Sequence, residues 1–381
     1  SDIKNADGSV VVSKGTLIGK AVTGEDGKAV FTADLPIGFS YDVKEIQAPE
    51  GYVRNQADVY SFDFTYTNDN EAKVTFTHTF INERVNATIR LQKKDAETNQ
   101  AVPQGDATLE NAVYGLYARK DIVHPDGASG VIYKAGDRVA TLTTDENGEA
   151  SVENLYLGEY FIKEITPPVG YLADESEHDL VCGYEGDLTA TVERECVSLE
   201  QVKKQPFEII KAANNGETDA DLLSGAGFTA YLLSDLTVKE DGSYDFDSAK
   251  PVVIGENGAT EIFTDERGHA CSIALPYGTY VVRETTTPHN YKPVDDFIVR
   301  ITEHKPNTPQ VWRVLLDEEF EAKLKIIKQD DETKKPVLHK GTEFRIYDLD
   351  NKEYVEQVTT YPTTTVHKTF FTDEEGYLIL P

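Results

Sequence analysis

The sequence predicts an all-β protein built as a linear array of tandem β-sandwiches. Strand-forming Thr, Val, Tyr and Phe alternate with Gly, Asn and Asp turns along the chain, and almost nothing reads as an amphipathic helix of useful length. Three short phrases also recur with a period of roughly 120 residues, which suits one β-sandwich for each repeat.

The first recurring phrase is a polar turn that begins with Thr and ends with Gly. It closes at Gly27, Gly148 and Gly268, so successive copies are 121 and 120 residues apart (148 − 27 and 268 − 148). A fourth copy runs from Thr372 to Gly376. Because Gly ends such a turn and opens the next strand, each copy predicts a boundary between two strands.

The second phrase is a strand that carries a lysine among alternating apolar residues. Phe207, Ile209 and Lys211 share one face, because strand residues two apart point the same way. Lys93 and Lys328 end the matching segments, at spacings of 118 and 117 residues (211 − 93 and 328 − 211). Each lysine is therefore expected on the apolar face of its strand.

The third phrase places a glutamate on a strand. In residues 158–171, Tyr160, Ile162 and Glu164 stand at i, i+2 and i+4 and so share the apolar face. Residues 38–52 and 278–291 repeat this arrangement, with Tyr41, Val43 and Glu45 in one copy and Tyr280, Val282 and Glu284 in the other. Three glutamates are therefore expected to point at a core.

Counting the phrases predicts four domains. Two are complete sandwiches, at residues 85–203 and 204–320. Residues 1–84 contain no lysine strand and are expected to form a partial sandwich without its first strands. Residues 321–381 are expected to form a partial sandwich without its last strands, so that the chain is an excerpt from a longer tandem array.

An inward lysine and an inward glutamate can be explained in two ways. Burying both ions without compensation costs several kcal/mol per ion, so the simpler explanation is a buried salt bridge. The other is chemical: burial favours the neutral amine, a nucleophile, and the protonated carboxyl group, a proton donor. A nearby Asn or Asp would then be converted to an amide with the lysine, once per molecule.

The last strand of each repeat is expected to carry the third residue of this set. Residues 74–82 alternate well and place Phe76, His78, Phe80 and Asn82 on one face. Asn82 precedes Lys93 by 11 residues, and the same count back from Lys211 and Lys328 reaches Glu200 and Asp317. The third position is therefore Asn, Glu and Asp in the first, second and third repeats.

The complete repeats have the same order of features: a lysine strand, a turn glycine, a glutamate phrase followed by Pro and Tyr, and a terminal strand. This order resembles the collagen-adhesin B-type domain, also called the SpaA-like pilin domain, of Gram-positive surface proteins. The resemblance covers nearly the whole chain. It implies immunoglobulin-like sandwiches, two complete and two partial here. It also implies an autocatalytic isopeptide bond between the first and last strands, which stiffens a stalk.

The resemblance implies a role for each candidate residue. In the third repeat Lys211 is the nucleophile, Glu284 the proton shuttle and Asp317 the acceptor. The second repeat has Lys93 and Glu164 but Glu200 as acceptor, so its strand register is open and a buried ionic cluster is the alternative to a bond. The remaining candidates lack partners in this sequence: Glu45 and Asn82 lack a lysine strand, and Lys328 lacks both a glutamate and an acceptor.

Charge and composition exclude several classes of protein. A net charge of −30 argues against nucleic-acid binding, which needs clustered Lys and Arg. No apolar run in this sequence could span a membrane or act as a signal peptide. Three cysteines cannot form a disulfide framework, and Cys182 and Cys196 are expected either to pair or to be buried thiols.

No cofactor, metal or turnover enzyme is expected, since the histidines are scattered and no phosphate loop or catalytic triad is readable. The main functional hypothesis is an extracellular stalk on the cell-wall surface of a Gram-positive bacterium, with neighbouring domains of the parent array as partners. One rival is an adhesin that binds a host or matrix protein or glycan through the inserts at 120–143 and 234–261. Another is a polymerised pilin subunit.

Overall fold

The computed structural model describes residues 2–32, 35–66, 74–214, 221–318, 325–359, 364–375 and 377–379. Regular structure in these ranges is almost entirely β-strand, and the helical segments found there are 3-10 turns at Leu233–Asp235, Phe246–Ser248 and Glu256–Gly258. The predicted all-β class is confirmed. Within the described ranges, no helix has the length and apolar character needed to cross a membrane.

Residue contacts divide the chain into two compact units. The first comprises Ser1–Gln205, Ala274–Thr279 and Arg300–Thr308, and the second comprises Pro206–Ile273, Tyr280–Val299 and Pro309–Pro381. The unit boundary at residues 205 and 206 lies close to the expected boundary between the second and third repeats.

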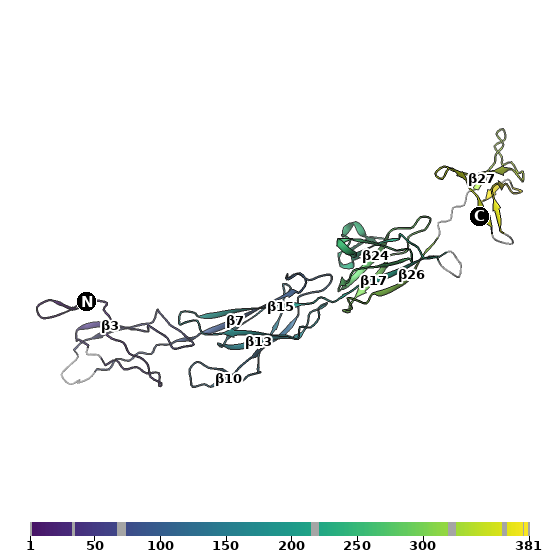
Figure 1. Cartoon of the computed structure of the whole chain (residues 1–381). Helices are drawn as coiled ribbons and strands as arrows, with labels where there is room; N and C mark the ends of the chain where they lie inside the picture. Colours follow the sequence, from purple (N-terminus) through teal and green to yellow (C-terminus); the bar gives the residue numbers. More distant parts are fainter. Residues whose placement is uncertain are drawn as a thin grey trace. The chain divides into compact units, whose positions relative to one another are not determined.

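The second repeat folds as a sandwich of two sheets. One sheet has the order β11-β8-β13-β14 and the other the order β12-β7-β15. Strands β7, β13 and β15 are grouped in the blue and teal part of Figure 1. The strands are β7 (Asn86–Asp95), β8 (Val113–Ala118), β11 (Arg138–Thr143), β12 (Glu149–Leu155), β13 (Gly158–Thr166), β14 (Glu177–Cys182) and β15 (Thr191–Glu200). Buried side chains from both sheets form one core, as expected of a sandwich.

The third repeat has the same arrangement. Its sheets have the orders β21-β18-β24-β25 and β22-β17-β26, which match the second repeat strand for strand. Strands β17, β24 and β26 lie in the green part of Figure 1. The strands are β17 (Phe207–Asn214), β18 (Gly227–Leu232), β21 (Glu261–Phe263), β22 (His269–Cys271), β24 (Gly278–Thr286), β25 (Phe297–Ile301) and β26 (Gln310–Glu318).

In both sandwiches the first strand pairs in parallel with the last. Strand β7 runs parallel to β15, and β17 runs parallel to β26. The lysine strand and the candidate acceptor strand are therefore neighbours in one sheet, while the glutamate strand lies in the opposite sheet. This topology brings residues more than 100 positions apart to one place in the core.

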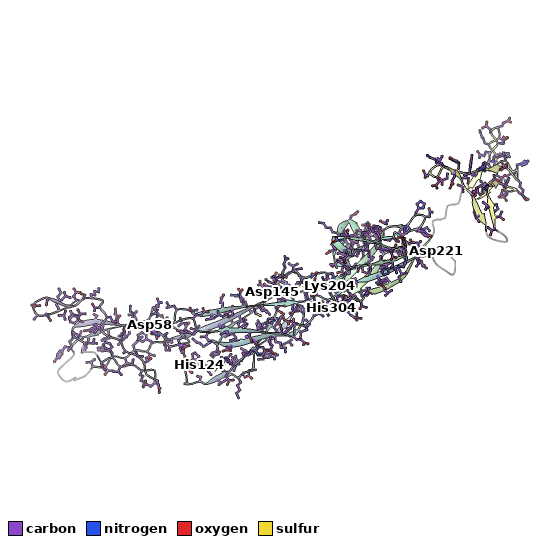
Figure 2. The ribbon with its side chains drawn as sticks, viewed as in Figure 1. Asp58, His124, Asp145, Lys204, Asp221 and His304 are labelled. Carbon is purple, nitrogen blue, oxygen red and sulfur yellow. The ribbon has the colours of Figure 1, made fainter. Side chains whose placement is uncertain are left out.

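Three of the turn threonines bind the turn to backbone groups that lie earlier in the same domain. The hydroxyl of Thr264 accepts from the backbone N–H of Ala226 at 2.9 Å and donates to the carbonyl of Leu223 at 2.8 Å. Thr144 and Thr372 make the equivalent pairs of bonds in the second and fourth domains. Asp145, labelled in Figure 2, accepts from two backbone N–H groups of its own turn at 2.9 Å.

The first repeat is less regular than the two sandwiches. Strand β3 (Phe39–Lys44) pairs with β5 (Val59–Phe64), and β4 (Tyr52–Val53) pairs with β6 (Glu83–Arg84). The strand expected over residues 74–82 is absent from this described segment, although Phe76 stacks on Phe62 at 4.3 Å. In the two sandwiches the equivalent strand pairs with the lysine strand, and this sequence supplies no such partner in the first repeat.

The fourth repeat contains four described strand pairs. Strand β27 (Lys325–Ile327) pairs with β34 (Tyr377–Ile379), and β28 (Glu343–Phe344) pairs with β33 (Phe370–Phe371). The other pairs are β29 (Tyr347–Asp348) with β30 (Glu353–Tyr354) and β31 (Gln357–Thr359) with β32 (Thr365–His367). The expected boundary at 320 and 321 and the turn residue Gly376 lie outside the described residues.

Short strands complete the described structure. They are β1 (Ile3–Lys4), β2 (Val10–Val12), β9 (Ile122–Val123), β10 (Val131–Tyr133), β16 (Lys204–Gln205), β19 (Thr237–Val238), β20 (Tyr244–Asp245) and β23 (Leu275–Pro276). The β9–β10 and β19–β20 hairpins occupy the two inserts noted in the sequence.

Candidate functional site

The lysine and glutamate of each complete sandwich point into the core, as the alternation of their strands predicts. Phe207, Ile209 and Lys211 have no exposed surface, and Lys93 is equally inaccessible at the end of its own apolar row. Glu164 and Glu284 are buried on the opposite sheet. Each sandwich therefore holds a charged pair where a hydrophobic contact would otherwise stand.

In the third domain, three side chains meet at one buried point. Lys211 Nζ donates to Glu284 Oε2 at 2.8 Å and also to Asp317 Oδ1. All three side chains are fully shielded from solvent. The ring of Phe228 lies 5.7 Å from Lys211 Nζ, so one wall of the site is apolar. The amine thus touches both a candidate proton carrier and a candidate acceptor.

The surroundings of this site shift the candidate acceptor towards its protonated form. Burial raises the pKa of Asp317 above its usual value, the positive charge of Lys211 opposes that rise, and Glu284 adds to it. Glu284 Oε1 and Asp317 Oδ2 are both buried without a hydrogen-bond partner. A buried carboxylate oxygen in that state is unfavourable, which is consistent with the raised pKa of Asp317.

Backbone contacts hold the lysine and the glutamate in place. The N–H of Lys211 donates to the carbonyl of Gly268 at 2.8 Å, and the N–H of Lys93 does the same to Gly148. The N–H of Val294 donates to Glu284 Oε2 at 2.9 Å. The turn glycine therefore contacts the lysine strand directly, which its place in a surface turn did not predict.

The second domain builds a larger polar cluster at the same position. Lys93 Nζ contacts Glu200 Oε1 and lies 3.2 Å from Glu164 Oε1. The hydroxyl of Tyr114 donates to Glu200 Oε1 at 2.7 Å and accepts from Lys93 Nζ at 3.1 Å. Ser198 adds a second hydroxyl, 3.0 Å from that of Tyr114. The side chains of Lys93, Glu164 and Glu200 are almost fully enclosed.

Burial changes the protonation of the second-domain amine. It lowers the pKa of Lys93 to about 8, against the opposing attraction of Glu164 and Asp174. The backbone N–H of Asp174 donates to Glu164 Oε2 at 2.8 Å and so keeps that carboxylate oriented. A substantial fraction of neutral amine is therefore accessible near neutral pH, unlike for an exposed lysine.

The strand register places the two acceptors at equivalent positions. Asp317 stands opposite Ala213, two residues beyond Lys211, and Glu200 stands opposite Asp95, two residues beyond Lys93. From the lysine to the candidate acceptor, the register of the second domain, left open by the sequence, is therefore the same as that of the third. Glu200 occupies the acceptor position itself.

The end domains place their candidate residues apart from any complete set. In the first domain Asn82 Nδ2 donates to Glu45 Oε2 at 2.7 Å. Val43, expected on the core face beside Glu45, is instead 43% exposed, because the described first domain has no second sheet over it. In the fourth domain Lys328 Nζ donates to Thr342 Oγ1 at 3.0 Å.

Several site residues escaped prediction. Tyr114 and Ser198 carry hydroxyls to Glu200, and Gly268 supports Lys211. From the sequence alone, a tyrosine on an apolar strand face is predicted to be an ordinary core residue. The one available signal was position: Tyr114 aligns with Phe228, so the two sandwiches differ by a hydroxyl where their acceptors also differ.

The buried cysteines and the possible metal ligands form no further site among the described residues. Cys182 and Cys196 are free buried thiols and not a disulfide, and burial raises the pKa of each to about 11. Thiols of that pKa are unreactive at neutral pH. The described residues contain no group of three or more His, Cys, Asp or Glu arranged to hold a metal.

Several solved structures are distantly similar to this chain. The Bacillus anthracis TIE protein is 21% identical, with 78% of this chain and 44% of that chain covered at a TM-score of 0.42. A minor pilin of Streptococcus agalactiae is 15% identical, with coverages of 62% and 97% and a TM-score of 0.27. A streptococcal ancillary pilin is 21% identical, with coverages of 75% and 76% and a TM-score of 0.24.

A family model establishes the family of this chain, which these distant structural similarities cannot do. The chain spans less than half the length of the TIE protein structure, and a search of curated proteins found no significant match. The family model of the SpaA prealbumin-like fold domain matches residues 2–79, 87–195 and 206–312. These three regions cover most of the sequence and coincide with the first three repeats. The chain belongs to the family of SpaA prealbumin-like fold domains.

Proposed function

We propose that this chain is an extracellular stalk region of a surface protein of a Gram-positive bacterium, stiffened by an internal amide between Lys211 and Asp317. Its domains hold another part of the parent protein away from the cell wall. The observation that carries the proposal is the enclosed contact of Lys211 Nζ with both Asp317 and Glu284. Family membership supports the same role.

The proposed reaction is a condensation within the folded domain. The neutral amine of Lys211 attacks Cγ of Asp317, forming the N–C bond, and one C–O bond of the carboxyl group breaks. Glu284 takes a proton from the amine and returns it to the departing oxygen, which leaves as water. Enclosure excludes competing solvent and holds the reacting groups in contact. The reaction occurs once, so the protein is not an enzyme in the usual sense.

The position of the amide accounts for its mechanical value. Lys211 lies on β17, the first strand of the domain, and Asp317 lies on β26, the last. Tension along a tandem array enters and leaves each domain through these strands. A covalent bond between them carries the load past the rest of the domain, so the sandwich stays folded under force.

The mass of the intact protein tests this proposal. The folded chain is expected to be lighter than its sequence mass by at least one water, and digestion should yield a peptide joining Lys211 to Asp317. The variant Asp317→Ala should lose that peptide. A full unmodified mass for the folded wild-type chain would overturn the bond.

A second candidate function rests on a pocket beside the β19–β20 hairpin. The pocket has a volume of about 220 Å³ and is lined by Lys239, Tyr244, Phe246, Arg283, Asp296 and their neighbours. The guanidinium of Arg283 lies 4.4 Å from the Phe246 ring. Aromatic and charged groups together suit a glycan or polar peptide, so the chain would then be an adhesin. Loss of binding to immobilised matrix proteins and glycans on deletion of residues 237–247 is the test.

A further inference from the structure

The second and third domains share their strand order and the placement of lysine and glutamate, and they differ at two positions of the site that contact each other. Glu200 stands where Asp317 stands, and Tyr114 stands where Phe228 stands. Tyr114 pairs across its sheet with Glu164, and Phe228 pairs in the same way with Glu284. The two differences therefore fall on directly interacting positions of one site.

The two differences compensate each other. Glutamate has one more methylene than aspartate, so its carboxyl group has an extra rotatable bond to be held in place. The Tyr114 hydroxyl supplies that restraint by donating to Glu200 Oε1 at 2.7 Å. Phe228 has no group that can donate a hydrogen bond. The shorter Asp317 side chain still accepts a hydrogen bond from Lys211 Nζ, although position 228 does not hold it.

The other oxygen of Glu200 is left without a partner. Glu200 Oε2 is buried and accepts no hydrogen bond, as is also true of Asp317 Oδ2 in the third domain. An unsatisfied buried carboxylate oxygen destabilises a fold. Departure of this oxygen as water removes the unsatisfied atom.

We propose that the second domain forms its own amide, between Nζ of Lys93 and Cδ of Glu200, with Tyr114 as the donor that stabilises the reacting carbonyl oxygen. The inference rests on the proposed function of the third domain, because it assigns the same chemistry to a longer acceptor. It adds a second covalent tie to the array and a catalytic role for a tyrosine that the third domain lacks.

The reaction balances as a simple condensation. Neutral Lys93 attacks Cδ of Glu200, the N–C bond forms, and the bond from Cδ to Oε2 breaks. Glu164, 3.2 Å from Lys93 Nζ, takes the amine proton and returns it to the departing oxygen, which leaves as water with the carboxyl proton. Negative charge develops on Oε1 in the tetrahedral intermediate, where the Tyr114 hydroxyl already donates.

Mass spectrometry of the full folded chain separates this proposal from the first. Two missing waters and two linked peptides, Lys93 to Glu200 and Lys211 to Asp317, are expected. If Lys211–Asp317 is the only linked peptide found, the Glu200 proposal is overturned and the proposed function stands. If neither peptide is found, both fall. The peptide from each domain is the internal control for the other.

Variants test the acceptor and the tyrosine separately. Glu200→Gln should form the same amide but lose ammonia in place of water, which identifies residue 200 as the acceptor. Tyr114→Phe should slow the Lys93–Glu200 bond about a hundredfold, measured after dilution from denaturant, and leave the Lys211–Asp317 rate unchanged. An unchanged Lys93–Glu200 rate would remove Tyr114 from the mechanism.

A double variant guards against a merely structural effect of Tyr114. Tyr114→Phe with Glu200→Asp introduces at these two positions the residue types of the third domain, Phe228 and Asp317. It should regain most of the bond formation that Tyr114→Phe alone loses. If the double variant folds, by circular dichroism, but is no faster than the single variant, the proposed compensation between positions 114 and 200 is wrong.

Discussion

The amide N–H of Lys211 donates to the carbonyl oxygen of Gly268 at 2.8 Å, and a Cβ added to Gly268 would lie 2.4 Å from the carbonyl oxygen of Lys211. Gly268 also has a φ of +65°, in the left-handed region that favours glycine. The turn and the reactive strand are therefore so close that no side chain fits between them.

Gly268→Ala should consequently impair both stability and cross-linking of the third domain. Gly242→Ala is the matched control, since Gly242 has a φ of +86° but no atom within 4 Å of its would-be Cβ. The control should lose about 1 kcal/mol from backbone strain alone. Gly268→Ala should lose clearly more stability than the control and form the Lys211–Asp317 bond more slowly.

Fluorescence of Trp312, the one tryptophan in the sequence, reports unfolding of this domain. Equal losses in the two variants would argue against the close approach.

Much of this site follows from the two-residue period of a strand. Alternation alone placed Lys93, Lys211, Glu164 and Glu284 on inward faces, because each continues a row of apolar side chains. The repeat period predicted one similar sandwich for each repeat, and the family resemblance implied that the first and last strands of each sandwich meet. The local pattern was sufficient wherever both sheets of a sandwich are present.

The failures concern contacts that depend on the opposite sheet. Val43 continues an apolar row but is exposed, since no described sheet covers it. Glu200 follows Cys196 and Ser198, a row too polar to identify its register, although Ser198 and Glu200 are buried. Parallel pairing with a strand about 100 residues away decides that register, and one strand's pattern does not contain it.

Thr264→Val should destabilise the third domain by about 1–3 kcal/mol, because it leaves a buried donor and a buried acceptor without partners. The groups affected are the N–H of Ala226 and the carbonyl of Leu223, both buried. Denaturant unfolding followed by Trp312 fluorescence measures the loss. Thr237→Val, on an exposed strand of the same domain, should change the stability by less than about 0.5 kcal/mol. A similarly small change in Thr264→Val would show that the hydrogen bonds of the turn threonine do not stabilise the domain.

Asp317→Ala and Asp317→Asn form a matched pair for the contribution of the amide to stability. Lys211 and Asp317 are 106 residues apart, and a covalent link across a loop of that size is worth about 5 kcal/mol by restriction of the unfolded chain. Asp317→Asn should still react, with loss of ammonia, and keep that stability. Asp317→Ala should unfold at a lower guanidinium concentration. The prediction would be contradicted if cross-linked Asp317→Asn and uncross-linked Asp317→Ala unfolded at the same guanidinium concentration.

The second-domain reaction should slow as the pH rises above about 8. The acceptor must be protonated when the amine is neutral, so the site must hold one proton on either Lys93 or Glu200. Below the Lys93 pKa of about 8 this proton is present, as ammonium with carboxylate or as amine with acid. Above it the proton is lost, and the amine faces a carboxylate, which is a poor electrophile. Asp174, Tyr114 and Tyr171 also lie near Lys93, and they do not replace this proton.

The rate should therefore be nearly constant from neutral pH to about 8 and then fall by about tenfold per pH unit. It is measured by diluting unfolded chain from denaturant into buffers of increasing pH, quenching with acid and quantifying the Lys93–Glu200 peptide. Glu200→Gln is the control, because an amide acceptor needs no proton to be electrophilic. Its rate should not show the additional loss that carboxylate ionisation causes. A wild-type rate that keeps rising above pH 8 would show that the proton on the acceptor does not limit the reaction.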